Sequence, residues 1–218
     1  MQTYPPLRTY KTRRGRVTLG QADALERLWS ELGVAVDGGP LYLVTLFGRA
    51  APVVLEIGFG MGEATADMAA AQPERDLLAV DVHTPGQGAL LRRVDEFGLT
   101  NVRVADGDAV VLLRKMVAPS ALAEVRIFFP DPWPKRRHWK RRLVGGDMVD
   151  LLARRLVSGG QVHLATDWPH YAEQARAALA AHPAFTPTDA IPWRAQTRFE
   201  RQGVAAGRTS IDVVAIRT

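Results

Sequence analysis

The sequence of 218 residues contains no cysteine. This absence excludes disulfide bonds, zinc sites built from thiolates and a cysteine nucleophile. The opening stretch MQTYPPLRTYKTRRGR lacks the apolar core of a signal peptide, and no apolar run approaches the length that crosses a bilayer. We therefore expect a cytoplasmic protein with no membrane partner.

Metal ligands are also scarce. Without cysteine, only histidines and carboxylates remain as candidates, and the five histidines show no spacing typical of a metal site. They are His83, His138, His163, His170 and His182. We expect structural or surface roles for these side chains and no bound metal.

Acidic residues are missing from residues 1–22, where five Lys/Arg lie within 8–16. A second basic segment, Lys135–Arg142, carries six Lys/Arg and a tryptophan. The net charge of the whole chain is only +5, so the rest of the chain is net negative. A single basic run is often a solvated surface, but two runs on an acidic body favour a polyanionic partner such as a nucleic acid.

Short apolar runs alternate with helical patterns from residue 50 to residue 182. This alternation predicts an α/β protein with a Rossmann-like doubly wound sheet that is mostly parallel. The last apolar run predicts an antiparallel carboxyl-terminal strand. The expected strands span 52–60, 76–83, 101–109, 124–131, 161–167, 184–189 and 210–218, and the expected helices span 63–71, 86–98, 110–118, 144–156 and 169–182.

Residues 1–218 predict one domain, because a chain of this length buries one sizeable core. Residues 1–40 resemble a basic extension with a short helix over 21–29, either packed on the domain or flexibly attached to it. Gly159 and Gly160 are expected to cap the helix over 144–156. The sequence leaves open whether the protein is a monomer or a homodimer.

A glycine-rich turn follows the first of these strands in LEIGFGMGEAT, with Gly58, Gly60 and Gly62. Such a turn lets a ligand approach the backbone closely. In the dinucleotide fingerprint G-x-G-x-x-G the third glycine would fall on Glu63, whose carboxylate disfavours a pyrophosphate. Glycines that only form a tight turn between strand and helix are the alternative interpretation.

Three acids lie at or near the ends of successive strands. Glu56 precedes the glycines, Asp81 ends the second strand at the distance typical of a ribose ligand, and Asp108 follows the third. Carboxylates around a glycine turn suit S-adenosylmethionine, which carries a sulfonium and an amino group, better than a cofactor that bears phosphates. We therefore expect S-adenosylmethionine as the cofactor.

The stretch FFPDPWPKRRHWKRRLV follows the fourth strand, and its prolines 130, 132 and 134 predict a rigid loop at the carboxyl end of that strand. This loop would hold Asp131 beside the cofactor, while Trp133 would offer a stacking face. The basic residues beyond it would contact phosphates. An exposed salt bridge between Asp131 and a neighbouring arginine is the alternative interpretation.

These motifs resemble the bacterial tRNA (guanine-N7-)-methyltransferase family, whose members have the class I methyltransferase fold. The resemblance covers nearly the whole chain and includes LEIGFGMGEAT, AVDVHTPGQGALL, FFPDPWPKRRHWKRRLV, LATDWPHYAE and TRFERQG in the order of the family. It implies methylation of guanosine 46 in the variable loop of tRNA. Two departures are small: Asp81 stands where glutamate is common, and Arg198 where lysine is common.

The resemblance also implies roles for individual residues. The cofactor would be bound by Glu56, Gly58, Gly60, Gly62, Asp81, Asp108 and Asp131, with Asp131 also catalytic. The substrate would be bound by Lys135, Asp167, Thr197, Arg198, Phe199 and Glu200. The charge of the basic run, rather than the resemblance, predicts that the RNA is bound by Arg136, Arg137, His138, Trp139, Lys140, Arg141 and Arg142.

The chemistry expected for this target needs no general base, because guanine N7 has an in-plane lone pair and loses no proton when it is methylated. Alignment and charge stabilisation should then supply the catalysis. Three alternatives remain: a methyltransferase acting on an exocyclic amine, a noncatalytic RNA-binding protein with the same fold, and, least favoured, a nicotinamide dehydrogenase. The identity of the methylated nucleoside would separate the first two from the favoured function.

Overall fold

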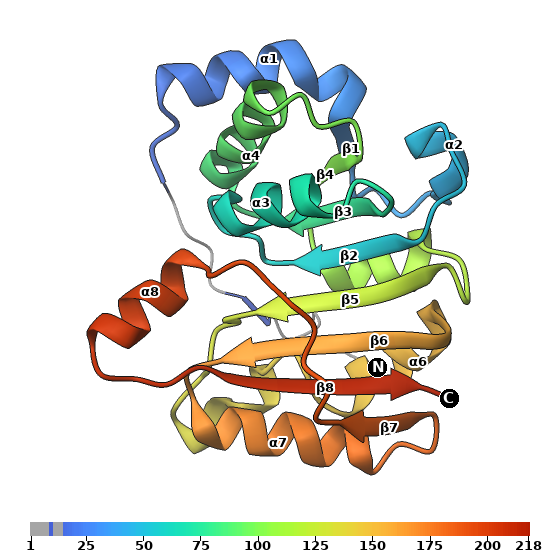
Figure 1. Cartoon of the computed structure of the whole chain (residues 1–218), viewed down its shortest axis with the longest axis vertical. Coiled ribbons are helices and arrows are strands. Elements are labelled where there is room, and N and C mark those ends of the chain that lie inside the picture. Colours follow the sequence, from blue (N-terminus) through green and yellow to red (C-terminus); the bar gives the residue numbers. More distant parts are fainter. Residues whose placement is uncertain (1–8, 11–14) are drawn as a thin grey trace, which may run out of the picture.

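The computed structural model describes residues 9–10 and 15–218, and these form an α/β fold built on one eight-stranded sheet (Figure 1). The strand order is β1-β4-β3-β2-β5-β6-β8-β7, with parallel pairing from β1 to β6 and antiparallel pairing of β8 with β6 and β7. The predicted fold class is confirmed. The strands are β1 (Gly33–Ala35), β2 (Val53–Ile57), β3 (Asp76–Asp81), β4 (Val102–Asp106), β5 (Leu122–Phe128), β6 (Leu156–Thr166), β7 (Phe185–Thr188) and β8 (Ile211–Arg217).

Helices cover both faces of the sheet because the central strands are apolar on both sides. All five residues of β2 are buried; Leu55 packs with α6 and α7 on one face, while Val54 packs with α3 and α4 on the other. The helices are α1 (Leu19–Leu32), α2 (Leu43–Phe47), α3 (Glu63–Ala71), α4 (Thr84–Glu96), α5 (Ala109–Val111), the π-helical turn η1 (Leu112–Met116), the 3-10 helix η2 (Arg136–Arg141), α6 (Gly146–Arg155), α7 (Pro169–Ala180) and α8 (Arg198–Ala205).

Residues 15–40 pack on the rest of the fold. Thr18 and Gln21 form a capping box that starts α1, and α1 buries Ala24 and Leu32 in the same cluster as the apolar side of α4. The chain then adds β1 as a parallel edge strand beside β4. The basic residues at 8 and 11–14 lie outside the described residues.

Two predicted elements differ from the structure. The prediction that Gly159 and Gly160 cap a helix was wrong: α6 ends at Arg155, and both glycines lie within β6. The pairing of β5 with β6 shifts register there, and Gly159 adopts a positive φ of 77°, so the glycines allow a bulge. The helix expected over 110–118 is instead the short α5 continued by η1, in which Val117 N–H donates to Leu112 O at 3.1 Å.

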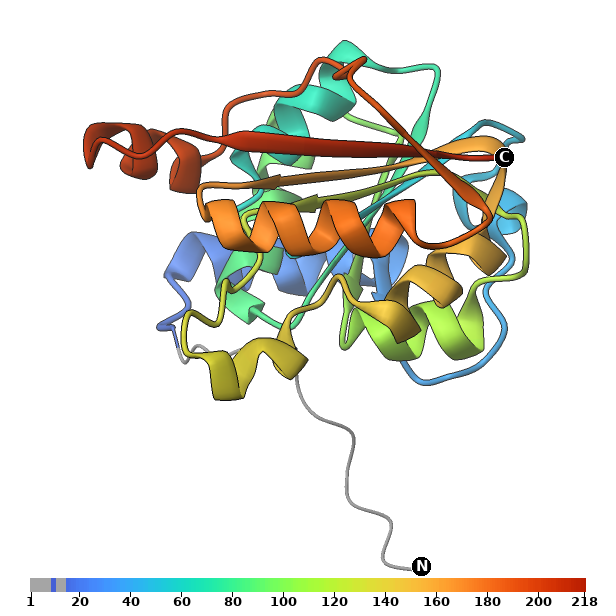
Figure 2. The same cartoon turned by 90° about the horizontal axis from the view of Figure 1, so that it is seen from below.

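The carboxyl-terminal part returns across the sheet. Residues 189–197, here named the crossing segment, pass in front of β5 and β6 in Figure 1 and place Ala195 against Phe128 and Met68 of α3. The segment leads into α8, which Figure 2 shows extending away from the body beside the start of β8. Sequence patterns did not predict α8, although Thr197 and Glu200 have the spacing of a helix amino-terminal cap.

Candidate active site

The glycine turn lies at the carboxyl end of β2, next to the point where the strand order reverses between β2 and β5. Gly58, Gly60 and Gly62 have positive φ values of 80°, 62° and 72°, a region that other residues rarely adopt. At Gly58 a Cβ would meet no atom within 4 Å, so the backbone borders open space there. The turn occurs where ligands bind in open α/β sheets.

Asp81 at the end of β3 is tied to this turn. Its carboxylate accepts from Gly60 N–H at 3.0 Å through one oxygen and from His83 N–H at 3.1 Å through the other. Burial raises the pKa of Asp81, and these backbone hydrogen bonds oppose the rise. Asp108 caps α5 by accepting from Val110 N–H at 2.8 Å, so the two acids are fixed by the turns that carry them.

Glu56 is buried in β2, with 3% of its surface exposed. Thr65 Oγ1 donates to its Oε1 at 3.1 Å, while Oε2 has no hydrogen-bond partner among the described residues. Burial raises the pKa of Glu56 to about 7, against the opposing charge of Arg126 on the neighbouring strand. A buried carboxylate oxygen without a donor fits a ligand that supplies one, such as an amino group.

Two adjoining pockets of about 140 and 320 Å³ lie over these strand ends. The first brings together predicted site residues from the carboxyl ends of the four strands β2 to β5, and the second contains Glu56 and the start of α8. Predicted residues lining the first pocket are Gly58, Gly60, Asp81, Asp108, Asp131 and Phe199; those lining the second are Glu56, Gly58, Gly60, Gly62, Thr197, Arg198 and Phe199.

The loop after β5 is held in an unusual conformation. Phe129 and Trp133 have positive φ values of 51° and 43°, which cost free energy in residues other than glycine and often occur at functional sites. Phe129 N–H donates to Ala165 O at 2.7 Å, and Trp133 Nε1 donates to Thr9 O at 3.1 Å. These contacts fix the loop so that Asp131 lines the first pocket.

The basic segment Lys135–Arg142 forms η2 and the residues on either side of it. Lys135, Arg136, Arg137 and Lys140 are exposed, so these four cations are available to phosphates. His138, Trp139 and Arg141 are half-buried, and the Trp139 ring lies 4.1 Å from the ring of His170.

Trp133 and Arg142 differ from their predicted roles. Trp133 is buried and Arg141 covers its ring at 3.7 Å, so its face is not offered for stacking. Arg142 was predicted to bind RNA, but it is only 4% exposed and donates to Pro132 O at 2.8 Å and to Gln174 Oε1 at 2.6 Å. Its guanidinium therefore braces the proline-rich loop instead of reaching a phosphate.

The predicted substrate residues come from three places in the chain. Thr197 caps α8 by accepting from Glu200 N–H at 3.1 Å, which sets the start of α8 beside the second pocket. Asp167 follows β6 and accepts from Arg208 Nε at 2.6 Å. Lys135 is exposed beyond the loop and lines neither pocket.

Sequence reasoning missed several residues around the pockets. Thr9 and Tyr10 line the first pocket together with His83, Phe128 and Phe129. Thr9 and Tyr10 are far from the strand ends in sequence, so no local pattern placed them there. His83 lies two residues after Asp81 and could have been found by extending the strand-end argument by two residues.

Solved structures with this fold are methyltransferases. The 16S rRNA methyltransferase KamB has a TM-score of 0.60 at 15% identity, covering 81% of this chain and 93% of its own. An antibiotic-related methyltransferase has a TM-score of 0.58 at 14% identity, covering 81% and 92%. The fold is thus that of a class I methyltransferase.

Sequence comparison gives the family. A profile for the family described as "Putative methyltransferase" matches residues 50–213. Curated proteins called tRNA (guanine-N(7)-)-methyltransferase are 54% identical over 95% of this chain and 74% of the relative in Streptomyces avermitilis, and 51% identical over 95% and 93% in Halorhodospira halophila. The chain belongs to the tRNA (guanine-N(7)-)-methyltransferase family and is an enzyme.

Two features of the described residues concern the expected partners. Among these residues, no helix is both long and apolar enough to cross a membrane. Within the same residues, no group of three or more histidines and carboxylates is arranged to hold a metal ion.

Proposed function

We propose that this enzyme transfers the methyl group of S-adenosylmethionine to N7 of guanosine 46 in the variable loop of tRNA. The observation that carries the proposal is the first pocket, in which the glycine turn, Asp81, Asp108 and Asp131 meet at the ends of four adjacent strands. The names of the curated relatives supply the target atom.

The residues of the pockets fit S-adenosylmethionine, which when bound supplies an electrophilic methyl group on sulfur. Asp81 would accept hydrogen bonds from the ribose hydroxyls, and Asp108 would face the adenine edge. Glu56 would bind the amino group through its unpartnered Oε2. Gly58 leaves space for the ligand beside the turn, because no atom lies where its Cβ would be.

Methyl transfer to N7 does not require a general base from the protein. The nucleophilic lone pair lies in the plane of guanine and no proton leaves, so alignment and charge stabilisation are the main tasks. Asp131 is fixed beside the pocket by the strained loop and would orient guanine or the cofactor. Its carboxylate also offers a negative charge near the purine as positive charge moves onto the ring.

The surface around the pocket supplies contacts for the tRNA backbone. Lys135, Arg136, Arg137 and Lys140 project from η2 and its approach, next to the loop that carries Asp131. Thr197, Arg198 and Phe199 lie on the other side, where they border the second pocket. A guanosine entering between them would reach the strand ends.

The test is methylation of an unmodified tRNA transcript with methyl-labelled S-adenosylmethionine, followed by identification of the nucleoside. We expect 7-methylguanosine, whose positive ring makes the strand cleavable at position 46 by reduction and aniline. A transcript with adenosine at position 46 is the control and should remain unlabelled. The proposal would be contradicted if the label appeared on an exocyclic amine, or if the wild-type enzyme incorporated no label.

A further inference from the structure

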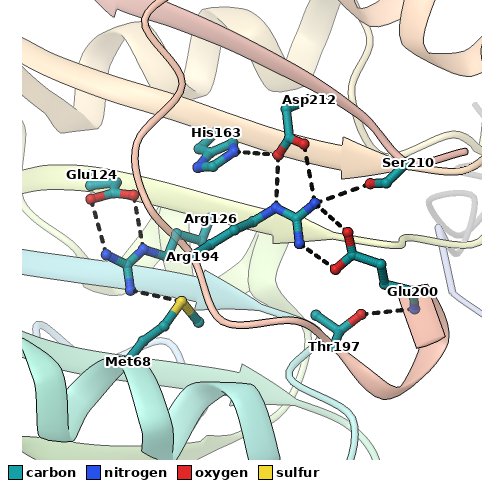
Figure 3. Close-up of polar contacts among 9 residues, drawn as sticks. All are labelled: Met68, Glu124, Arg126, His163, Arg194, Thr197, Glu200, Ser210 and Asp212. Atoms are coloured by element: carbon teal, nitrogen blue, oxygen red, sulfur yellow. Dashed lines mark hydrogen bonds and ion pairs between the residues drawn. The ribbon is translucent and has the colours of Figure 1, made fainter.

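Arg194 lies in the crossing segment and joins α8 to the sheet (Figure 3). On one side its Nη1 and Nη2 donate to the two oxygens of Glu200 at 2.6 and 2.9 Å. On the other side its Nε and Nη2 donate to the two oxygens of Asp212 in β8 at 2.7 and 3.1 Å. A planar guanidinium can make both forked pairs at once, which an ammonium group cannot.

The Asp212 end of this network is anchored in the sheet. His163 of β6 is 1% exposed, and its Nε2 lies 2.7 Å from Asp212 Oδ1. Burial alone would raise the pKa of Asp212, but hydrogen bonds from His163 and Arg194 outweigh it and lower the pKa to about 2. The Asp212 carboxylate therefore stays negatively charged, and it fixes the Arg194 guanidinium to β8.

The other contacts of Arg194 lead to the first pocket. Its guanidinium carbon lies 5.5 Å from the ring centre of Phe128 and 5.8 Å from that of Phe129, and both rings line that pocket. Glu200 lies in the first turn of α8. Phe199, the residue before Glu200 in the same turn, lines both pockets. Arg194 thus connects the pocket wall, the sheet and the start of α8 without itself lining either pocket.

A second ion pair of α8 offers a comparison. Arg201 Nη2 lies 2.6 Å from Glu63 Oε2, but the two side chains are 49% and 33% exposed. The side chains of Arg194 and Glu200 are only 9% and 13% exposed. Exposed pairs contribute little because water and salt screen them, whereas loss of one partner of a buried pair leaves an uncompensated charge. The buried pair should therefore fix α8.

We propose that Arg194 is a positioning residue for methyl transfer, acting through Glu200 to hold the start of α8 over the pockets. Both carboxylate oxygens of Glu200 are directed at Arg194, so the predicted substrate residue Glu200 also serves as the attachment point of the helix. The inference rests on the proposed function for its kinetic readout and on the structure alone for its structural readout.

The kinetic test compares Arg194→Lys, Glu200→Gln, their double variant and the matched control Arg201→Gln in tRNA methylation. Arg194→Lys keeps the charge but loses the double fork. We expect its turnover to fall about 100-fold, the loss that a misplacement of about 1 Å can cause. The KM for S-adenosylmethionine should change less than about threefold, and the double variant should be no slower than the worse single variant, as for residues that act as a unit.

The structural test is amide hydrogen exchange of the enzyme without tRNA. Peptides covering 198–205 should exchange faster in Arg194→Lys and Glu200→Gln than in the wild type or Arg201→Gln, while peptides of β6 stay protected. Glu200→Gln leaves the contacts of Arg194 with Asp212 in place, so it tests the inference even when Arg194→Lys does not fold.

The outcomes separate this inference from the proposed function. A wild-type enzyme that fails to methylate N7 contradicts the proposed function, while the exchange data still test the attachment of α8. Unchanged exchange in both variants, additive kinetic losses, or an equal loss of turnover in Arg201→Gln would each overturn the role of Arg194.

Discussion

Four carboxylates of this protein, Glu56, Asp81, Glu124 and Asp212, fall into two groups. Glu56 and Asp81 at the pockets have raised pKa values because burial is only partly offset by their partners. For Glu124 and Asp212, burial acts in the same direction, but Arg126 and Arg75 at Glu124, and His163 and Arg194 at Asp212, outweigh it and lower the pKa. Acids whose charge is not compensated inside the protein are suited to a cationic or hydroxyl-bearing ligand.

Asp81→Ala should weaken S-adenosylmethionine binding by about 1.5–3 kcal/mol, the range for hydrogen bonds to charged groups. The variant loses the proposed ribose acceptor and the hydrogen bond that Asp81 accepts from Gly60 N–H. Isothermal titration calorimetry measures the effect. Asp106→Ala is the matched control: Asp106 ends the neighbouring strand but lines neither pocket. Equal affinity of Asp81→Ala and wild type would remove Asp81 from the cofactor site.

Glu56 predicts a pH dependence of cofactor binding. Its pKa of about 7 means that the carboxyl becomes protonated as pH falls below 7, and a protonated carboxyl cannot pair with the amino group of the ligand. The Kd for S-adenosylmethionine should therefore rise by up to about tenfold per pH unit below 7 and level off above it. Titrations between pH 5.5 and 8.5 measure it, and Glu56→Gln should bind weakly and lose this dependence. The same slope in Glu56→Gln would assign the titration to another group.

At the scale of the element, η2 with Lys135 before it forms a cationic surface supported by a buried brace. Lys135, Arg136, Arg137 and Lys140 are exposed, while Arg142 joins the end of the segment to Pro132 and Gln174. The segment therefore contains exposed residues that can reach a phosphate and one residue, Arg142, that holds the loop beside Asp131.

Arg136→Ala, Arg137→Ala and Lys140→Ala together should reduce the slope of log affinity for tRNA against log salt by about 2–3, because each phosphate contact contributes about 0.7–0.9. Filter binding across a range of salt concentrations measures the slope, and cofactor affinity should not change. Arg142→Ala is the contrasting variant, expected to lower the unfolding midpoint because the loop loses its brace. An unaltered slope in the triple variant would make the segment a solvated surface.

Several elements could be predicted because local physics decides them. The buried strands, the glycine turn and the helix over 63–71 follow from apolar runs, positive φ values and helical spacing. The glycines at 159–160 were misread because a helix cap and a β-bulge both favour glycine, and only pairing with β5 distinguishes them. Arg142 was misread because burial of one cation within a basic run depends on Pro132 and Gln174, which are separated from each other in sequence.

At the scale of the whole molecule, the parallel sheet brings residues from distant parts of the sequence together at one edge, where they form the candidate site. Strands β4, β3, β2 and β5 are neighbours and end at the same edge, so Asp81, Asp108 and Asp131 meet at one pocket although Asp81 and Asp131 are 50 residues apart in the sequence. This convergence could be predicted from strand alternation alone. The approach of Thr9, Tyr10 and Arg194 could not, because it depends on how distant segments pack across the strand ends.

Under the proposed function, the acids at this edge serve methyl transfer to N7 of a tRNA guanosine. The most direct measurement is a single-turnover reaction on two transcripts, one with guanosine at position 46 and one with 7-deazaguanosine there, which replaces N7 by C–H and keeps the exocyclic groups. Our account predicts methylation of the first transcript and none of the second, with equal binding of both. Methylation of the 7-deazaguanosine transcript at the wild-type rate would contradict it and favour transfer to an exocyclic amine.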